Sequence, residues 1–307
     1  SFKIRGAYNK IYSAYLDNIS NISITTCSAG NHAQGVAKTC NHLQIEHVIF
    51  VPISTPKQKI DRIKYFGGDY LTLHVIGDTL KEALELSIIH SKTISSIFVH
   101  PYNDIDVILG QSTVAQEIYE NIEPDYIIVP VGGGGLISGV GSYSKMFNPK
   151  CEIIGVEPEN ANSMQLSLHN RLATKVIHLD TFVDGASVEI VGDKCFAISE
   201  SLIDKMVSIN NGHLCADIIE LYQNDGIITE PAGALGISAL EYIKDEIANK
   251  TVVCILTGGN NDLTRYPNMV ERANQYNGVK HYFLIDFNQI SGQLVHFAQS
   301  VLIEGVD

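Results

Sequence analysis

Four consecutive glycines stand in the stretch Val129-Pro130-Val131-Gly132-Gly133-Gly134-Gly135-Leu136-Ile137-Ser138-Gly139. An apolar run, 126–131, leads into them, and residues compatible with a helix follow. Consecutive glycines lose much conformational entropy on folding, so they occur where the backbone turns sharply or closely approaches a ligand. A strand that enters a glycine turn and then a helix presents unpaired N–H groups at the positive end of the helix dipole. The stretch therefore predicts an anion site, most often one for phosphate.

A nucleotide is one candidate ligand for this loop. The dinucleotide motif G-x-G-x-x-G needs a glycine where Ile137 or Ser138 stands, although Glu157 lies near the distance expected of a ribose-binding acid. A Walker loop needs a lysine directly after Gly139, where Val140 is found. A nucleotide therefore stays open as the weaker alternative, and the sequence favours an isolated phosphate group.

Predicted strands and helices alternate on both sides of the glycine run. Apolar runs predict strands at 22–26, 47–51, 71–76, 96–99, 126–131, 153–156 and 251–256, and apolar periodicity predicts helices at 7–16, 33–43, 56–66, 79–92, 111–121, 212–224 and 234–246. This alternation is typical of doubly wound α/β proteins with parallel sheets. Ligands bind such sheets at the carboxyl ends of the strands.

The composition limits the classes of partner. A chain of 307 residues is long for one core and favours two domains. Its 21 basic and 34 acidic residues give a net charge of −13 without a basic cluster, which argues against nucleic acid and anionic membrane surfaces as partners. Six cysteines without C-x-x-C spacing favour reduced core residues of a cytoplasmic protein, and metal-ligand spacing is absent from the sequence.

The two ends of the chain differ from its middle. The first residues, 1–6, carry no initiator Met, so we expect the chain to begin inside a domain. After Asn277-Gly278, a strand is expected at 281–287 and a helix at 293–302. One strand and one helix do not form a core by themselves, so this tail predicts the truncated start of another domain.

Polar residues follow two of the predicted strands. Ser28-Ala29-Gly30-Asn31-His32 comes after the first strand, and its small residues at a helix N-terminus suit a carboxylate. An ordinary helix cap explains Ser28 or Asn31 alone equally well. Thr257 comes after the last strand and is well placed for a ligand, although a plain loop is the alternative.

Lys3 is a candidate of a different kind. It stands between Phe2 and Ile4, and from composition alone a solvated lysine is the commoner outcome. Burial near Arg5 and apolar groups would instead favour the neutral amine that a Schiff-base lysine requires. The spacing does not distinguish these two outcomes.

Taken together, these stretches resemble the fold type II pyridoxal phosphate enzymes, and among them the threonine dehydratases (threonine ammonia-lyases). The motifs occur in the family's order: S-F-K-I-R-G-A at 1–7, S-A-G-N-H-A-Q-G at 28–35, G-Q-S-T at 110–113, V-G-G-G-G-L at 131–136, V-D-G-A at 183–186, E-P-A-G-A at 230–234 and T-G-G-N at 257–260. Ser112 replaces a glycine that is common in this family. The tail from about Lys280 is similar to the opening of the ACT-like regulatory domain of the biosynthetic form.

The resemblance implies a fold and a set of roles. The fold would be tryptophan synthase β-like, with a catalytic domain over 1–278, a smaller part at about 28–110 inserted in it, and a partial ACT-like α+β domain over 279–307. Lys3 would hold pyridoxal 5′-phosphate as a Schiff base and later take the proton from the substrate Cα. The remaining contacts would be Gly132, Gly133, Gly134, Gly135 and Leu136 with the phosphate, Asn31 with the ring 3′-oxygen, Thr257 with the ring nitrogen, and Ser28, Ala29, Gly30, Asn31 and His32 with the substrate carboxylate.

The implied activity is deamination of L-threonine to 2-oxobutanoate and ammonia, the first step of isoleucine biosynthesis. The resemblance also implies a cytoplasmic homo-oligomer, a dimer or tetramer, that isoleucine or valine controls. A serine dehydratase or serine racemase of the same fold is the nearest alternative. A non-catalytic relative that only binds a ligand is another.

Overall fold

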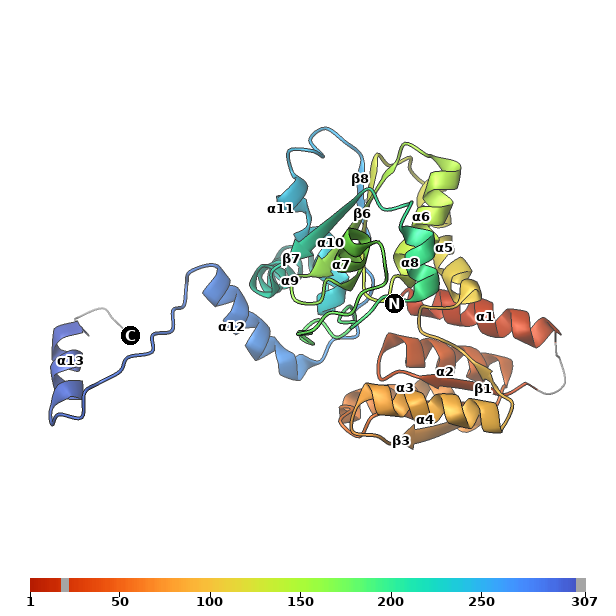
Figure 1. Cartoon of the computed structure of the whole chain (residues 1–307), viewed down its shortest axis with the longest axis horizontal. Coiled ribbons are helices and arrows are strands. Elements are labelled where there is room, and N and C mark those ends of the chain that lie inside the picture. The colour runs from red at the N-terminus through yellow and green to blue at the C-terminus, as the bar shows by residue number, and fades with distance from the viewer. Residues whose placement is uncertain (18–21, 302–307) are drawn as a thin grey trace.

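Two parallel sheets of four strands organise the two lobes of the protein (Figure 1). The computed structural model describes residues 1–17 and 22–301. The lower lobe in Figure 1 contains the first four strands, the upper lobe contains the last four, and the C-terminal tail runs away from both. The predicted α/β class with two doubly wound parallel sheets is confirmed.

The first sheet has the strand order β3-β2-β1-β4 and every pairing in it is parallel. In β2, Ile49 and Val51 pack with residues of α2 and α3, whereas Phe50 packs with a residue of α4. Alternate side chains of a strand point to opposite faces, so helices cover both faces of this sheet. Its elements are β1 (Ile24–Cys27), α2 (Asn31–Leu43), β2 (His47–Val51), α3 (Lys57–Gly67), a 3-10 turn (Gly68–Tyr70), β3 (Leu71–Val75), α4 (Leu80–Thr93) and β4 (Ile97–Phe98).

The second sheet has the order β7-β6-β5-β8 and is likewise parallel. Its central strand β5 sends Ile127 and Val129 towards α6 and sends Ile128 towards α9 and α10. Its elements are α5 (Ile105–Tyr119), β5 (Tyr126–Pro130), α6 (Gly135–Phe147), β6 (Glu152–Pro158), α7 (Ser163–Asn170), α8 (Asp193–Ser199), β7 (Lys205–Ile209), α9 (Asn211–Asp225), α10 (Pro231–Ser238), α11 (Leu240–Ile243), β8 (Val252–Cys254), a 3-10 helix (Leu263–Arg265) and α12 (Tyr266–Tyr276).

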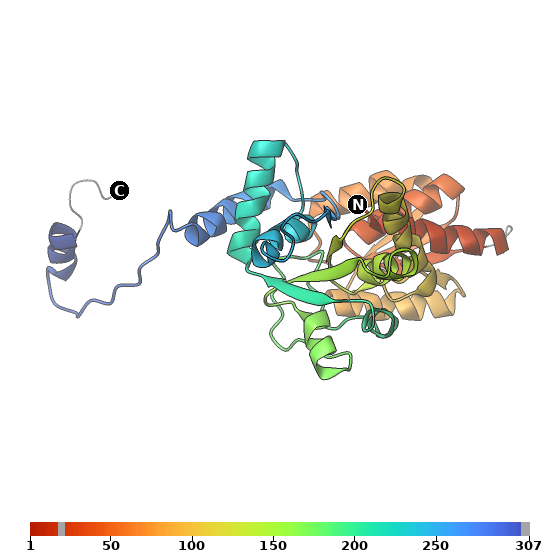
Figure 2. The ribbon, with the colours of Figure 1, turned by 90° about the horizontal axis from the view of Figure 1, so that it is seen from above.

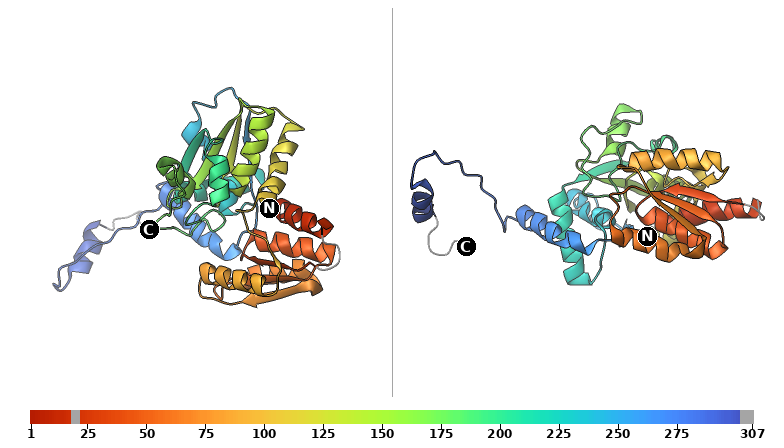
Figure 3. Two further views of the ribbon diagram at one scale, coloured as in Figure 1. Left: turned by 45° about the vertical axis from the view of Figure 1, so that its right-hand side comes forward. Right: turned by 90° about the horizontal axis from the view of Figure 1, so that it is seen from below.

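Helix α1 (Lys3–Asp17) connects the lobes. It packs against α2 of the first lobe and against α5, and α5 packs against α6 of the second lobe. The start of α1 therefore lies between the two lobes, as Figures 1 and 3 show from different sides. This placement brings Lys3 to the junction of the two sheets.

Several predicted element boundaries were wrong. Helix α5 begins six residues earlier than the predicted 111 because Asp104 caps it, with Oδ1 accepting from the N–H groups of Asp106 (2.9 Å) and Val107 (3.4 Å). The predicted helix 234–246 is split into α10 and α11. Just before the break, the Ser238 hydroxyl donates to the carbonyl of Ala234 (3.4 Å), a bond that tends to bend helices.

The tail differs from its prediction in one respect. The helix expected at 293–302 is present as α13 (Gln293–Val301), and residue 302 lies outside the described residues. The strand expected at 281–287 is wrong, because that segment runs beside no other strand that could supply hydrogen bonds to it within the described part of the chain. Figure 2 shows the tail projecting beyond α12.

Candidate active site

The glycine run forms the first turn of α6. Gly134 is the N-cap of this helix and has φ +93°, a left-handed conformation that glycine adopts without strain. The first amides of a helix have no acceptor within it, so the N–H groups at 135 and 136 are available to an anion. This arrangement agrees with the anion site that the sequence predicts.

A cavity of about 30 Å³ opens on the glycine run. Sequence-predicted residues from three distant parts of the chain share its wall: Lys3, Gly132, Gly133, Gly134, Gly135, Leu136 and Thr257. Thr257 is buried, and its hydroxyl donates to the carbonyl of Ala232 at 3.2 Å. The structure therefore brings together the predicted phosphate loop, the lysine and the hydroxyl at the carboxyl ends of β5 and β8.

Lys3 points into this cavity from the first turn of α1. Its Nζ donates to the carbonyl of Pro101 at 2.8 Å and lies 5.3 Å from the ring centroid of Phe2. Burial of the amine lowers the pKa of Lys3 to about 8, against the opposing effects of Cys195 and Glu230. At pH 7 about one tenth of this amine is therefore neutral and nucleophilic, far more than for a lysine with the ordinary pKa of 10.5.

Arg5 does not contribute to this lowered pKa. Its guanidinium forms two hydrogen bonds with the carboxylate of Glu117, at 2.6 and 2.7 Å, and one with Thr113 at 3.0 Å. The sequence hypothesis placed Arg5 close to Lys3 as a cause of the neutral amine. The structure instead assigns that effect to burial alone.

The predicted carboxylate-binding stretch lies beside this cavity and not in its wall. Ser28 accepts a hydrogen bond from the N–H of Gly30 at 3.2 Å, and no atom would come within 4 Å of a Cβ built on Gly30. Asn31 opens α2, and its Nδ2 donates to Oε1 of Glu230 at 2.6 Å. Ala29 lies in the same β1–α2 connection. The open space at Gly30 leaves this loop accessible to a small ligand.

His32 is turned into the core. It is 2% exposed, and its Nε2 lies 3.1 Å from the carbonyl of Val99. Burial lowers the pKa of His32 to about 3, so the ring is neutral at physiological pH. The ring Nδ1 is also buried and has no hydrogen-bond partner among the described residues, so the backbone amide of His32, in the first turn of α2, is the group that would meet a ligand.

The segment that follows β4 also belongs to the cavity, although it was not predicted from the sequence. Tyr102 lines the cavity; a Cβ on Gly133 would overlap its ring, and a Cβ on Gly135 would come as close as 3.0 Å to its Cβ. The backbone N–H groups of Tyr102 and Asn103 donate to Nδ1 of His100, at 3.3 and 2.9 Å, which holds the turn in place. The signal was available, because this segment follows a predicted strand as Ser28 and Thr257 do.

Glu157 does not face the cavity. It is fully buried, and its carboxylate accepts from the N–H groups of Met164 (2.7 Å) and Gln165 (2.9 Å) in the first turn of α7. Burial raises the pKa of Glu157 to about 8. The ribose-binding role considered for Glu157 is therefore wrong, because its oxygens are committed to a helix N-terminus.

Comparison with known proteins agrees with this geometry. The family described as "Pyridoxal-phosphate dependent enzyme" matches residues 1–258. The chain belongs to this family. Membership of this family explains why a lysine, a glycine loop and a hydroxyl meet around one cavity. It also removes a nucleotide as the alternative ligand of the glycine loop.

Named relatives show which enzymes within this family the chain is similar to. The biosynthetic L-threonine dehydratase of Halalkalibacterium halodurans is 44% identical over 308 residues, which cover 98% of this chain and 73% of the relative. The processed threonine deaminase isoform 2 of Solanum lycopersicum has a TM-score of 0.82 at 38% identity, covering 89% of this chain and 79% of that one. The serine racemase of Dictyostelium discoideum has a TM-score of 0.78 at 31% identity, covering 86% of this chain and 84% of that one.

The residues present fit pyridoxal phosphate. The phosphate requires backbone N–H groups without bulky side chains, and the glycine run supplies them, since a Cβ on Gly132 would approach the Cα of Ala186 to 3.1 Å. The aldehyde requires an amine that loses its proton easily, and Lys3 supplies it. The ring nitrogen requires a polar partner, and Thr257 is the buried hydroxyl in the same wall.

Proposed function

We propose that this chain is a threonine ammonia-lyase that converts L-threonine into 2-oxobutanoate and ammonia. The observation that carries the proposal is the meeting of Lys3, the glycine run and Thr257 in one cavity. The similarity to named threonine dehydratases supports L-threonine as the substrate. Bound pyridoxal phosphate supplies a carbonyl carbon for the substrate amine and a conjugated ring that withdraws electrons from the substrate Cα.

Lys3 has two tasks in this proposal. Its neutral amine would hold the cofactor, and when it is not engaged in that bond it would take the proton from the substrate Cα. Both tasks require the unprotonated amine, which its lowered pKa provides. The carbonyl of Pro101 keeps Nζ at the cavity when it is not covalently engaged.

Gly132, Gly133, Gly134, Gly135 and Leu136 would bind the phosphate through backbone N–H groups at the start of α6. Ser28, Ala29, Gly30, Asn31 and His32 would bind the substrate carboxylate through the N-terminus of α2. The Asn31 amide nitrogen carries two hydrogens. One of them is given to Glu230, and the other would serve the 3′-oxygen of the ring.

Thr257 would favour elimination over transamination. Its hydroxyl donates to the carbonyl of Ala232, and with the cofactor bound it would be free to turn towards the ring nitrogen. A hydroxyl carries no negative charge, so it does not keep that nitrogen protonated as a carboxylate would. With a less strongly electron-withdrawing ring, the site would favour prompt loss of the β-hydroxyl group.

We further propose the organisation of the whole protein. Residues 1–278 form the catalytic domain, with about 28–110 as its smaller part, and 279–307 begin an ACT-like domain that responds to isoleucine or valine. The protein works as a homo-oligomer in the cytoplasm, which agrees with its six free thiols. None of the helices in residues 1–17 and 22–301 combines the length and apolar character that crossing a membrane needs.

The proposal is tested by incubating the purified chain with pyridoxal phosphate and L-threonine and measuring 2-oxobutanoate. The wild type is expected to release it, and Lys3→Ala is expected to lose both turnover and the visible absorbance of the covalently bound cofactor. Retention of both by Lys3→Ala contradicts the proposal. Deletion of 279–307 is expected to abolish any inhibition by isoleucine, and unchanged inhibition contradicts the proposed role of the tail.

A serine racemase or serine dehydratase is the second candidate, because the serine racemase similarity also covers most of the chain. Turnover of L-threonine and L-serine in parallel, with the enantiomer of recovered serine measured, separates these activities. A preference for L-serine, or formation of D-serine, favours the second candidate. Lys3, with its pKa lowered towards neutrality, argues against a non-catalytic binding protein.

A further inference from the structure

Asp184 joins three parts of the chain that are distant in sequence. Its Oδ2 lies 2.5 Å from Nζ of Lys59 on α3, and its Oδ1 lies 3.5 Å from Nη1 of Arg265 at the end of the 3-10 helix before α12. The two cations therefore approach different oxygens of one carboxylate. Lys59 belongs to the first lobe and Arg265 to the second, so Asp184 links the lobes electrostatically.

The residues that follow Asp184 form part of the wall of the cofactor cavity. Gly185 and Ala186 line this cavity together with Lys3 and the glycine run. A Cβ on Gly132 would lie 3.1 Å from the Cα of Ala186 and 3.3 Å from the carbonyl oxygen of Gly185. The two loops are thus in close contact, and a displacement of one changes the space at the other.

Phe182, two residues before Asp184, is held from the α12 side. The Arg265 guanidinium donates to the carbonyl of Phe182 and lies 5.0 Å from its ring centroid. The guanidinium of Arg272 lies 4.3 Å from the same centroid. Two arginines of the second lobe therefore contact one end of the segment 182–186. Lys59 of the first lobe forms an ion pair with Asp184 in the middle of the same segment.

Two further contacts cross the same junction. Asn31 of α2 donates to Glu230 at 2.6 Å, and Gln58 of α3 donates to the carbonyl of Asn261 at 3.4 Å. Both join the first lobe to loops at the carboxyl ends of the second sheet. Among these three crossing contacts, the pair of Lys59 with Asp184 is the ionic one.

We propose that Asp184 is a positioning residue, which sets the wall of the cofactor cavity through its ion pairs with Lys59 and Arg265. The inference rests on the proposed function and deepens it. The Asp184 side chain is 42% exposed and that of Lys59 is 18% exposed, so water and salt screen the pair and its contribution to stability is small. Its effect is geometric, because small displacements of groups around a reacting centre reduce rates strongly.

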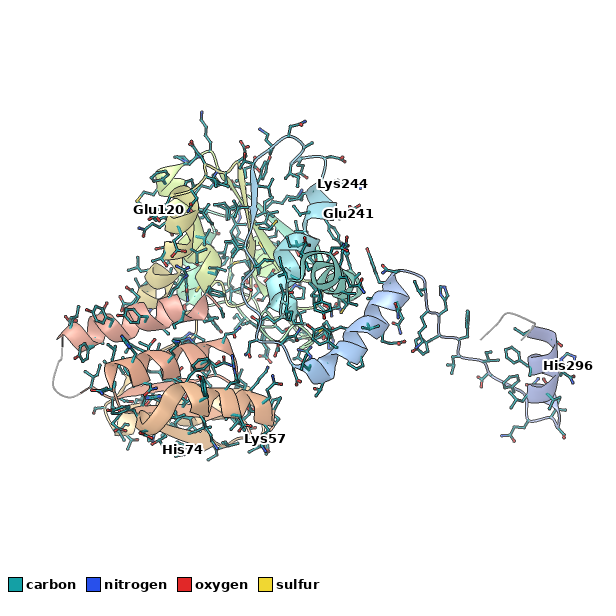
Figure 4. The ribbon with its side chains drawn as sticks, turned by 180° about the vertical axis from the view of Figure 1, so that it is seen from behind. Lys57, His74, Glu120, Glu241, Lys244 and His296 are labelled. Atoms are coloured by element: carbon teal, nitrogen blue, oxygen red, sulfur yellow. The ribbon has the colours of Figure 1, made fainter. Side chains whose placement is uncertain are left out.

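The experiment compares Lys59→Met, Asp184→Asn and the double variant with the wild type. Lys57→Met is the matched control, since Lys57 is an exposed residue of the same helix, labelled in Figure 4. Two quantities are measured: the Kd of pyridoxal phosphate by equilibrium dialysis, and kcat/KM for L-threonine. The Kd does not depend on turnover. If the wild type releases no 2-oxobutanoate, the proposed function is refuted, and the dialysis still tests the role of Asp184.

Lys59→Met and Asp184→Asn are each expected to raise the Kd and to lower kcat/KM by about tenfold. Lys57→Met is expected to change neither, and the midpoint of urea unfolding is expected to move little in any variant. Because both cations act through one carboxylate, adding Lys59→Met to Asp184→Asn should produce no further loss. If Lys59→Met raises the Kd and lowers kcat/KM equally in the wild type and in Asp184→Asn, the proposal is overturned.

High salt provides an independent measurement if Asp184→Asn does not fold. Salt screens the exposed ion pair in the wild type, so added NaCl should move its Kd towards that of Lys59→Met. The Kd of Lys59→Met itself should then respond less to salt than those of the wild type and Lys57→Met. If Lys59→Met and Lys57→Met have the same Kd for pyridoxal phosphate at low and at high salt, the proposal is overturned.

Discussion

Replacing Lys3 with Met should stabilise the cofactor-free chain while it abolishes activity. Burial lowers the pKa of Lys3 from 10.5 to about 8, so the charged amine is disfavoured in the folded state. This difference corresponds to about 3 kcal/mol of unfolding free energy. Lys3 is partly accessible to solvent, which makes that figure an upper bound.

The difference in unfolding free energy between Lys3→Met and the wild type depends on pH. Below pH 8 the lysine is charged in both states, and the full destabilisation is present. Between pH 8 and 10.5 the unfolded chain binds more protons than the folded chain, so the stability contributed at this site rises with pH. Methionine also removes the hydrogen bond to Pro101, which costs about 1 kcal/mol at every pH. The net gain should be about 2 kcal/mol at pH 7 and should turn into a small loss above pH 10.5.

Urea unfolding of the cofactor-free wild type and Lys3→Met, each at several pH values, measures this difference. Comparing the two chains at each pH cancels the titration of all other groups. Lys57→Met is the control for losing an exposed lysine and should differ little from the wild type throughout. A stability difference for Lys3→Met that stays constant between pH 7 and 10.5 would refute the argument that burial lowers the pKa of this amine.

The other predictions concern the cavity wall. Gly133→Ala should weaken pyridoxal phosphate binding at least tenfold, because its Cβ would overlap Tyr102, whereas Gly236→Ala, whose Cβ has ordinary contacts of 3.5 Å or more, should not; dialysis measures both. Thr257→Ser should keep most of the turnover of L-threonine and Thr257→Val should lose it, since the hydroxyl is the group proposed to face the ring nitrogen; equal activities would argue against that role. Asn31→Asp should lower kcat/KM about tenfold or more by placing a second carboxylate beside Glu230, and the loss should be smaller in a Glu230→Gln background.

The local sequence was sufficient to predict the parallel α/β class and the glycine turn that opens α6. The apolar run 126–131 and the glycines after it determine a strand, a turn and a helix start by backbone preference alone. The residues of Ser28 to His32 and Thr257 were found in the same way, because each follows a strand. These features depend on residues that are neighbours in the chain.

Elements that depend on distant partners were missed or misplaced. A strand at 281–287 was expected from its apolar residues, but β-structure requires a neighbouring strand, and the described residues provide none there. Strand β7 was missed although it pairs with β6 along Ile154 to Pro158. Tyr102 follows a predicted strand, but its contact with the glycine run, which lies far along the chain, appears only in the folded protein.

The state of Lys3 was decided by the tertiary structure alone. Its sequence neighbours, Phe2 and Ile4, fit a solvated lysine as well as a nucleophilic one. Packing of α1 between the lobes buries the amine, turns Arg5 towards Glu117 and brings Nζ to the glycine run. Desolvation depends on all surrounding atoms, whichever part of the chain they come from, so no local pattern encodes it. The sequence by itself determined the glycine turn at the start of a helix, and the fold determined which amine stands beside it.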